Sequence, residues 1–101
     1  MQFTTSAQTA QLTIALTGTF RFDDHDGFKG VLKAIDDYDG EQIHIDLSKT
    51  TAIDSAGVGM LLLAHERSKK QSKSLSLGGA HGPVEQVLEL TRIASIMDVR
   101  P

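Results

Sequence analysis

The sequence predicts one α/β domain with a mixed, mostly parallel sheet of four or five strands and helices after the second, third and fourth strands. Apolar residues alternate with polar ones in several short segments, as in strands, and recur every three or four residues in others, as in helices. The two kinds of segment follow each other along the chain, which favours parallel strands joined by right-handed helical connections. The length of 101 residues fits a single domain.

Two short strands and a helix are predicted for the first third of the chain. The clearer strand spans residues 12–17, where Leu and Ile alternate with Thr and Ala, and Gly18 ends the run. The helix lies between Asp24 and Tyr38, before an Asp-Gly pair that stops it. Its apolar residues have the spacing of one helix face: Phe28, Val31, Leu32 and Ile35.

A strand and a second helix are predicted for the middle of the chain. Residues 43–47 alternate between apolar and polar, as in a strand, and the S-K-T-T that follows predicts a turn. The helix begins at Asp54 or Ser55 and ends in a cluster of basic residues, which the helix dipole favours there. Met60 and Leu63 lie beside its core face, where they either pack against another element or contact a partner. The predicted core face consists of Val58, Leu61, Leu62 and His65.

The last third is predicted to contain one strand and one helix. Residues 74–78 form the strand, and Pro83 is suited to the first turn of the helix. Val84, Val87 and Leu88 give that helix an apolar face. Residues 93–99 either form a terminal strand or pack against the sheet in another way, and the pattern does not distinguish the two.

The composition argues against several classes of protein. Ten Lys and Arg against thirteen Asp and Glu, without a basic stripe, argue against binding to nucleic acid. The absence of cysteine excludes disulfides, thiolate metal sites and cysteine nucleophiles, and it suits a reducing cytoplasm. The N-terminus has no signal-peptide pattern, so the mature protein is expected to begin at Met1. No segment has the roughly 18 apolar residues of a membrane span, so a cytoplasmic protein without membrane insertion is expected.

Ser55 is the main candidate for a functional residue, because it lies at the predicted start of a helix. A hydroxyl there can cap the helix by accepting a hydrogen bond from a free backbone N–H. The same N–H groups and the positive end of the helix dipole also accommodate a phosphate. Phosphorylation would add about −1.5 to −2 charges beside Asp54 and weaken binding to an acidic or apolar partner surface. Capping and regulation by phosphorylation are both open on this pattern.

A longer segment around Ser55 carries a family resemblance. I-D-L-S-K-T-T-A-I-D-S-A-G-V-G-M-L-L-L resembles the central signature of STAS domains, as found in bacterial anti-sigma factor antagonists. The similarity covers nearly the whole chain, since L-T-G-T-F and P-V-E-Q-V-L-E-L-T are similar to other segments of the family. The resemblance implies one STAS-like domain over residues 1–101 and a role in signal transduction and transcription regulation. It also implies that Ser55, which follows Asp54, is the phosphorylation site.

The resemblance implies a partner-switching cycle as well. The unphosphorylated protein binds an anti-sigma factor or an HPK-like serine kinase, phosphorylation by the kinase ends the complex, and a PP2C-type phosphatase restores it. The protein is not the enzyme in this cycle and needs no cofactor. The residues expected to contact the partner are Arg21, Asp24, Asp54, Ser55, Ala56, Gly57, Val58, Gly59 and Met60.

Two positions depart from the family pattern. Arg21 stands where the family often has an acidic residue, in a loop that the family places near the phosphorylated serine. Arg21 therefore either pairs with phosphorylated Ser55 or is a solvated surface residue. Ala56 stands where some relatives carry a second serine, so one hydroxyl remains at this point.

Other functions fit the residues less well. The nucleophile elbow of hydrolases requires Gly two positions before the serine, and Ile53 occupies that position. The G-V-G at 57–59 lacks the third glycine of a dinucleotide fingerprint, and the four histidines lack metal-ligand spacing. The main alternative is a constitutive STAS adaptor subunit of a lipid-transport ATPase, which needs no phosphorylation cycle.

Overall fold

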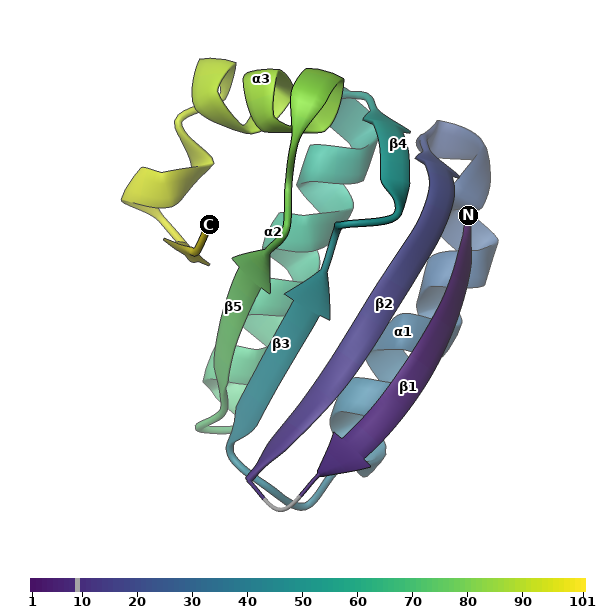
Figure 1. Ribbon diagram of the computed structural model, residues 1–101. Helices are drawn as coiled ribbons and strands as arrows, with labels where there is room; N and C mark the ends of the chain where they lie inside the picture. The colour runs from purple at the N-terminus through teal and green to yellow at the C-terminus, as the bar shows by residue number, and fades with distance from the viewer. Residues whose placement is uncertain (9) are drawn as a thin grey trace.

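A mixed sheet with two helices on one face forms the body of the protein in a computed structural model that describes residues 1–8 and 10–101 (Figure 1). The strands run in the order β1-β2-β3-β5-β6, and β4 pairs with the end of β2. β1 and β2 are antiparallel and the other pairs are parallel, which confirms the predicted mixed, mostly parallel sheet. The strands are β1 (Gln2–Gln8), β2 (Gln11–Phe20), β3 (Gln42–Asp46), β4 (Thr50–Ile53), β5 (Ser74–Gly78) and β6 (Asp98–Val99).

Three α-helices connect the strands. α1 and α2 both lie behind the sheet in Figure 1, whereas α3 lies at the end of the molecule toward which β2 to β5 point. This end also holds the start of α2. The helices are α1 (His25–Asp37), α2 (Ser55–Lys70) and α3 (Gly82–Leu90), and short 3-10 turns span Phe22–Asp24 and Ile93–Ser95.

β4 is the strand that the sequence did not predict, and with β6 it brings the sheet in the described residues to six strands rather than four or five. β4 takes up part of the predicted S-K-T-T turn. The buried hydroxyl of Thr50 donates a hydrogen bond to the backbone oxygen of Leu16 (2.8 Å), which fixes the start of β4 on β2. Gly18 does not end β2: with φ of +88°, it is opposite Thr50 of β4, and the register of the β2–β4 pair shifts between Gly18 and Thr19.

The closing segment forms a short strand after a 3-10 turn. β6 pairs in parallel with β5, with Val99 opposite Leu77. Ile93 and Met97 are buried in the core beside it, whereas Ile96 is exposed. The segment therefore does both things that its pattern left open. Its end extends the sheet as a two-residue strand, and the residues before that strand pack in the core.

Helix α1 buries the face that its spacing predicts. Phe28, Val31, Leu32 and Ile35 are all in the core, and the ring of Phe28 stacks on Phe20 with 5.3 Å between centroids. Gly30, an unfavourable residue inside a helix, lies against β1. A Cβ at this position would lie 2.9 Å from the ring of Phe3, so the glycine allows the helix and strand to approach closely.

Helix α2 buries a different set of residues from the predicted face. Leu62 and His65 are only partly buried, because the helix packs against α1 on one side and against β4 and β5 on another. The ion pair between Arg67 and Asp36, with 2.7 Å between Nη2 and Oδ2, links α2 to α1. The buried residues are Gly57, Val58, Met60, Leu61, Ala64 and Ser68.

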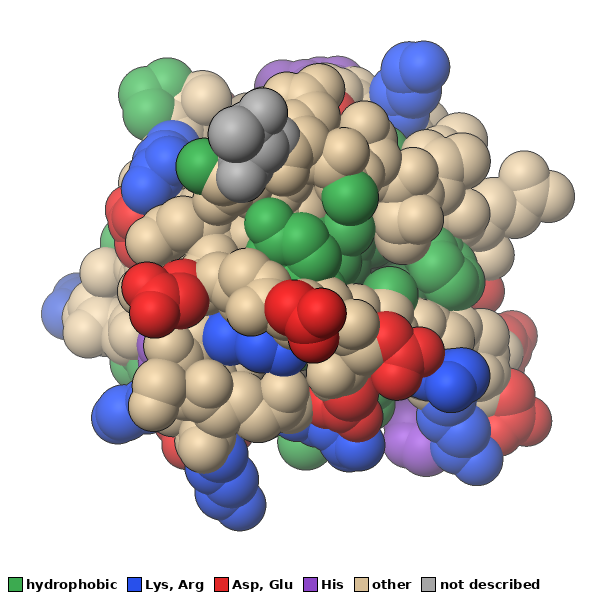
Figure 2. All heavy atoms as spheres, turned by 90° about the horizontal axis from the view of Figure 1, so that it is seen from below, with side chains coloured by type: hydrophobic (Ala, Val, Ile, Leu, Met, Phe, Trp, Pro, Cys, Tyr) green, Lys and Arg blue, Asp and Glu red, His purple; other side chains and the backbone are tan. Residues whose placement is uncertain are grey.

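Figure 2 shows the end of the molecule where the β1–β2 hairpin and the last turns of α1 and α2 lie. A small group of hydrophobic side chains lies there with acidic and basic ones along its lower side in the view, so neither sign of charge dominates this end. None of the helices in residues 1–8 and 10–101 has the length and apolar character needed to cross a membrane.

Candidate functional site at the start of helix α2

Asp54, rather than Ser55, caps helix α2. The Oδ1 atom of Asp54 accepts a hydrogen bond from the backbone N–H of Gly57 (2.8 Å), and its backbone oxygen accepts one from Val58 (3.1 Å). Among the hydrogen bonds of the described residues, none involves the hydroxyl of Ser55, which is the first residue of the helix and is exposed. The capping role considered for the serine therefore belongs to its neighbour.

The same carboxylate holds the β2–α1 loop against the start of α2. Oδ2 of Asp54 accepts a hydrogen bond from the backbone N–H of Phe22 (3.2 Å), and the N–H of Asp54 donates to the oxygen of Phe20 (3.3 Å). The bond from Gly57 is the main cause that holds the pKa of Asp54 below its ordinary value; the bond from Phe22 and the charge of Arg21 act in the same direction. Asp54 is therefore ionised at neutral pH.

Arg21 and Asp24 shape the loop that Asp54 holds. The backbone N–H of Arg21 donates to Oδ2 of Asp24 (2.8 Å), and the N–H of Asp24 donates back to the oxygen of Arg21 (2.9 Å). Asp24 also pairs with the α-amino group of Met1 (2.7 Å), which is the main cause of its lowered pKa. The positive charge of Arg21 lowers the pKa of both Asp24 and Asp54, so this loop lies near the capped helix start.

Burial divides the predicted contact residues into two groups. Ser55 and Gly59 are exposed and Ala56 is partly exposed, so these residues line one accessible stripe of the helix. Met60 and Val58 are 5% and 6% exposed and pack in the core, and Gly57 is buried as well. These three residues support the site from beneath and are not available for direct contact with another protein.

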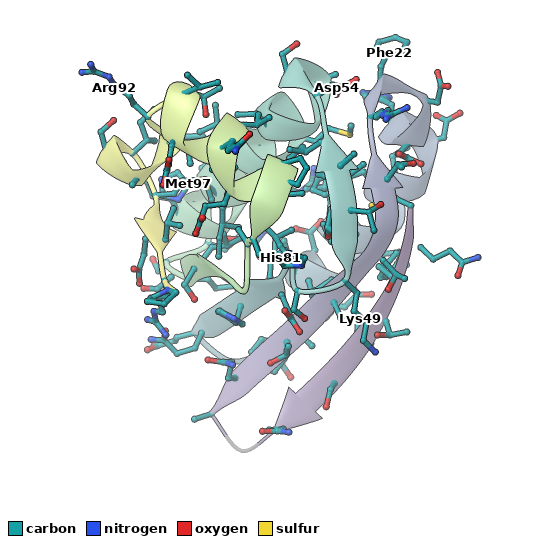
Figure 3. The ribbon with its side chains drawn as sticks, turned by 45° about the horizontal axis from the view of Figure 1, so that its top comes forward. Phe22, Lys49, Asp54, His81, Arg92 and Met97 are labelled. Atoms are coloured by element: carbon teal, nitrogen blue, oxygen red, sulfur yellow. The ribbon has the colours of Figure 1, made fainter. Side chains whose placement is uncertain are left out.

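Phe22 is a site residue that the sequence analysis missed. It is 69% exposed and its backbone N–H is bound to Asp54. Figure 3 shows Phe22 and Asp54 at the same end of the molecule, with the Phe22 ring directed outward. One signal was present in the sequence: Phe22 lies among charged residues in R-F-D-D, outside the apolar face of α1. An exposed aromatic ring on a backbone that is held in place suits a contact with a partner.

Two of the four histidines make contacts outside this arrangement of residues. Nδ1 of His44 on β3 lies 2.7 Å from the hydroxyl of Ser76 on β5, and burial lowers the pKa of His44. Nε2 of His81 lies 2.9 Å from the backbone oxygen of Ser48. No group of three or more His, Cys, Asp or Glu side chains in residues 1–8 and 10–101 is placed to hold a metal ion.

Replacing Asp54 by alanine is expected to lower the melting temperature more than replacing Ser55 by alanine. The first change removes the cap and the link to the Phe22 backbone, whereas the Ser55 hydroxyl contributes to neither. Asp54→Asn is expected to fall between the two, because its amide oxygen still accepts from Gly57. Thermal unfolding of the three variants at neutral pH measures this order, and equal losses for Asp54→Ala and Ser55→Ala would contradict it.

The charge of Asp54 also predicts a dependence on pH. Because its pKa is lowered in the folded protein, the carboxylate contributes stability above its unfolded pKa of about 3.9. This contribution is lost as the pH falls through the lower, folded pKa. Asp54→Asn should therefore lose stability less steeply than the wild type below about pH 4. Identical acid unfolding curves would show that the charge does not matter.

Comparisons with known proteins agree over nearly the whole chain. A family model described as Mlab, STAS domain matches residues 3–98. A STAS-domain containing protein of Pseudomonas aeruginosa (strain UCBPP-PA14) is 26% identical over 94 residues, which are 93% of this chain and 92% of that protein. Solved structures with the same fold include two described as anti-sigma factor antagonists.

The first of these structures, a Thermotoga maritima protein described as an anti-sigma factor antagonist, has a TM-score of 0.86 and 19% identity. The similarity covers 98% of this chain and 86% of that one. The second is the anti-sigma factor antagonist SpoIIAA in its unphosphorylated form, with a TM-score of 0.71 and 15% identity. It also covers 98% of this chain and 86% of the other. At these identities the two likenesses show the fold.

Proposed function

Because this chain belongs to the STAS domain family, we propose that it is an anti-sigma factor antagonist whose binding to a protein partner is controlled by phosphorylation of Ser55. The observation that carries this proposal is the division of roles between Asp54 and Ser55. Asp54 caps α2, which leaves the exposed serine hydroxyl accessible to a kinase. Phosphorylation would therefore break no hydrogen bond on which the start of the helix depends.

The electrostatic surroundings support a switch rather than a change of fold. A phosphate at the first position of α2 is favoured by the helix dipole. It also adds negative charge next to the ionised Asp54, which creates a concentrated negative region on the surface. An acidic or apolar partner surface that fits the unphosphorylated protein would be repelled or would have to desolvate this charge.

The proposed contact surface consists of the accessible residues around the serine. Phe22 supplies an apolar anchor, and Gly59, one helical turn after Ser55, leaves room for the partner to approach. Arg21 supplies a positive charge at the edge of this surface, near Asp54. Val58 and Met60 act beneath the surface by packing α2 against the core.

The proposed cycle takes place in the cytoplasm of a bacterial cell. The unphosphorylated protein binds an anti-sigma factor or an HPK-like serine kinase, the kinase releases itself by phosphorylating Ser55, and a PP2C-type phosphatase restores the first state. A neighbour of the same fold, SpoIIAA, is described in an unphosphorylated form, which supports regulation by phosphorylation in chains of this kind. The protein is the substrate of the kinase in this cycle and does no chemistry itself.

The test is capture of partners from the native cell lysate with four forms of the protein: wild type, Ser55→Ala, Ser55→Asp and Ser74→Asp. Ser74 is an exposed serine at the start of β5, so its variant controls for the added charge. Ser74 follows the far end of α2, whose 16 residues span about 24 Å. We expect Ser55→Asp to lose an anti-sigma or kinase-like regulator by at least about tenfold, or 1.4 kcal/mol. The other three forms should retain it.

Two other outcomes would change the proposal. Equal recovery of a transporter subunit by all four forms would favour the constitutive adaptor role.

Adding Arg21→Ala to the wild-type and Ser55→Asp forms tests whether Arg21 pairs with the added negative charge. Losses of partner affinity that are simply additive would show that the two positions are not coupled.

A further inference from the structure

The first strand of the sheet has a long edge without the usual protection against pairing with another chain. β1 hydrogen-bonds to β2 on one side, and its residues are exposed except for the partly buried Phe3. Its sequence, Q-F-T-T-S-A-Q, has no charged residue and no proline. Natural sheets usually protect such an edge with lysine, proline, a bulge or a covering element, because free backbone groups bind other strands.

The other outer strands in the described part of the chain do carry such protection. β6 is only two residues long and bears the ion pair between Asp98 and Arg100, with 3.0 Å between Oδ2 and Nη2. β4 packs against helix α3. β1 forms the right-hand edge of the sheet in Figure 1, with α1 behind it and no further strand beside it in residues 1–8 and 10–101. The open edge is therefore a property of β1 in particular.

The register of the hairpin shows which backbone groups point outward. On β2, the backbone N–H of Gly18 and the backbone oxygen of Leu16 bond to the β4 segment, on the side away from β1. The odd-numbered residues of β2 therefore bond to β1, and Gln11 forms a hydrogen-bonded pair with Gln8. Hydrogen-bonded and non-hydrogen-bonded pairs alternate along an antiparallel ladder. The even-numbered residues of β1 therefore bond to β2. The outward N–H and C=O groups belong to Phe3, Thr5 and Ala7.

We propose that β1 pairs antiparallel with β1 of a second copy of this chain, with Thr5 opposite Thr5. In this register the outward-bonding residues Phe3 and Ala7 face each other, so all three outward positions form hydrogen-bonded pairs. The other pairs are polar, Gln2 with Gln8 and Thr4 with Ser6, and no like charges meet. Because one strand pair buries little area, the dimer is reversible and weak, with a dissociation constant below about 1 mM. This inference does not depend on the phosphorylation of Ser55.

Engineered cysteines test the pairing directly, because the chain has no cysteine of its own. At the symmetric position the two Thr5 Cα atoms would lie about 5.5 Å apart, within the range of about 4.4–6.8 Å that a disulfide spans. Thr5→Cys should therefore form a disulfide-linked dimer at least about tenfold faster under mild oxidation than Gln86→Cys, an exposed site on α3. Equal rates for the two variants would overturn the proposal.

Sedimentation over a range of concentrations provides an independent measurement. The wild type should shift from monomer toward dimer with concentration, whereas Thr5→Pro should remain a monomer, since it removes an outward N–H and leaves the bonds to β2. Circular dichroism shows whether Thr5→Pro is folded. If it is not, the comparison of Thr5→Cys with Gln86→Cys decides whether β1 pairs with a second copy. A wild type that stays monomeric to about 1 mM would overturn self-pairing. If such a monomer instead captured a different protein through β1, the edge would serve strand donation from that protein.

Discussion

Replacing Phe20 by alanine is expected to destabilise the protein by about 3–5 kcal/mol, the usual cost of removing a large buried ring. Phe20 is fully buried at the end of β2 and stacks on Phe28 of α1. Its backbone oxygen also accepts the hydrogen bond from Asp54. Because a domain of this size has about 5–15 kcal/mol of stability in total, the melting temperature should fall by more than about 10 °C.

Phe22→Ala is the matched control for this experiment. The two phenylalanines are two residues apart, but Phe22 is exposed and its ring supports no part of the core. Its removal should change the free energy of unfolding by no more than about 0.5 kcal/mol, while it weakens capture of the proposed partner. Chemical denaturation of both variants measures the difference, and similar losses would mean that the Phe22 ring is packed rather than exposed.

The second large effect is expected for Gly57→Ala. A Cβ at this position would lie 2.7 Å from the backbone oxygen of Phe20 and 2.6 Å from Cγ1 of Ile53. Neither atom is the free end of a flexible side chain, so β2 and β4 would have to move away from the start of α2. We expect a loss of about 1–3 kcal/mol, although alanine is the better helix former by about 1 kcal/mol.

Gly59→Ala should instead raise the free energy of unfolding. A Cβ there meets no atom within 4 Å and the position is exposed, so the gain in helix propensity is not offset. The variant should be more stable by about 0.5–1 kcal/mol. If the partner approaches the helix closely at this point, the same variant should bind it more weakly. Urea unfolding of Gly57→Ala and Gly59→Ala measures the change in the free energy of unfolding for each. A stabilised Gly57→Ala would contradict the close packing of β2 on α2.

Several parts of the fold followed from local patterns. The face of α1, the bounds of β5 and the place of Ser55 at the start of α2 depend on residues within a few turns or one strand of each other. Periodicity of apolar residues and the position of glycine and proline are sufficient signals at this range.

The parts that local patterns missed depend on contacts between distant segments. β4 is a strand because Thr50 and Ile53 pair with the end of β2, about 30 residues earlier in the chain. Met60 is buried because α2 packs against both α1 and the sheet, so the buried face is wider than one apolar stripe. A helical pattern by itself contains no information on how many neighbours the helix has.

The sequence by itself determined the class of fold, the order of most elements and the serine at a helix start. Each of these depends on the spacing of residues that are close together in the chain. Only the tertiary structure decided that Asp54 is the cap, that its second oxygen holds the Phe22 backbone, and that the Phe22 side chain is exposed. The physical reason is that a carboxylate has two oxygens and can bind two segments at once. Which segments these are depends on the packing of β2 against β4 and of the loop after β2 against α2.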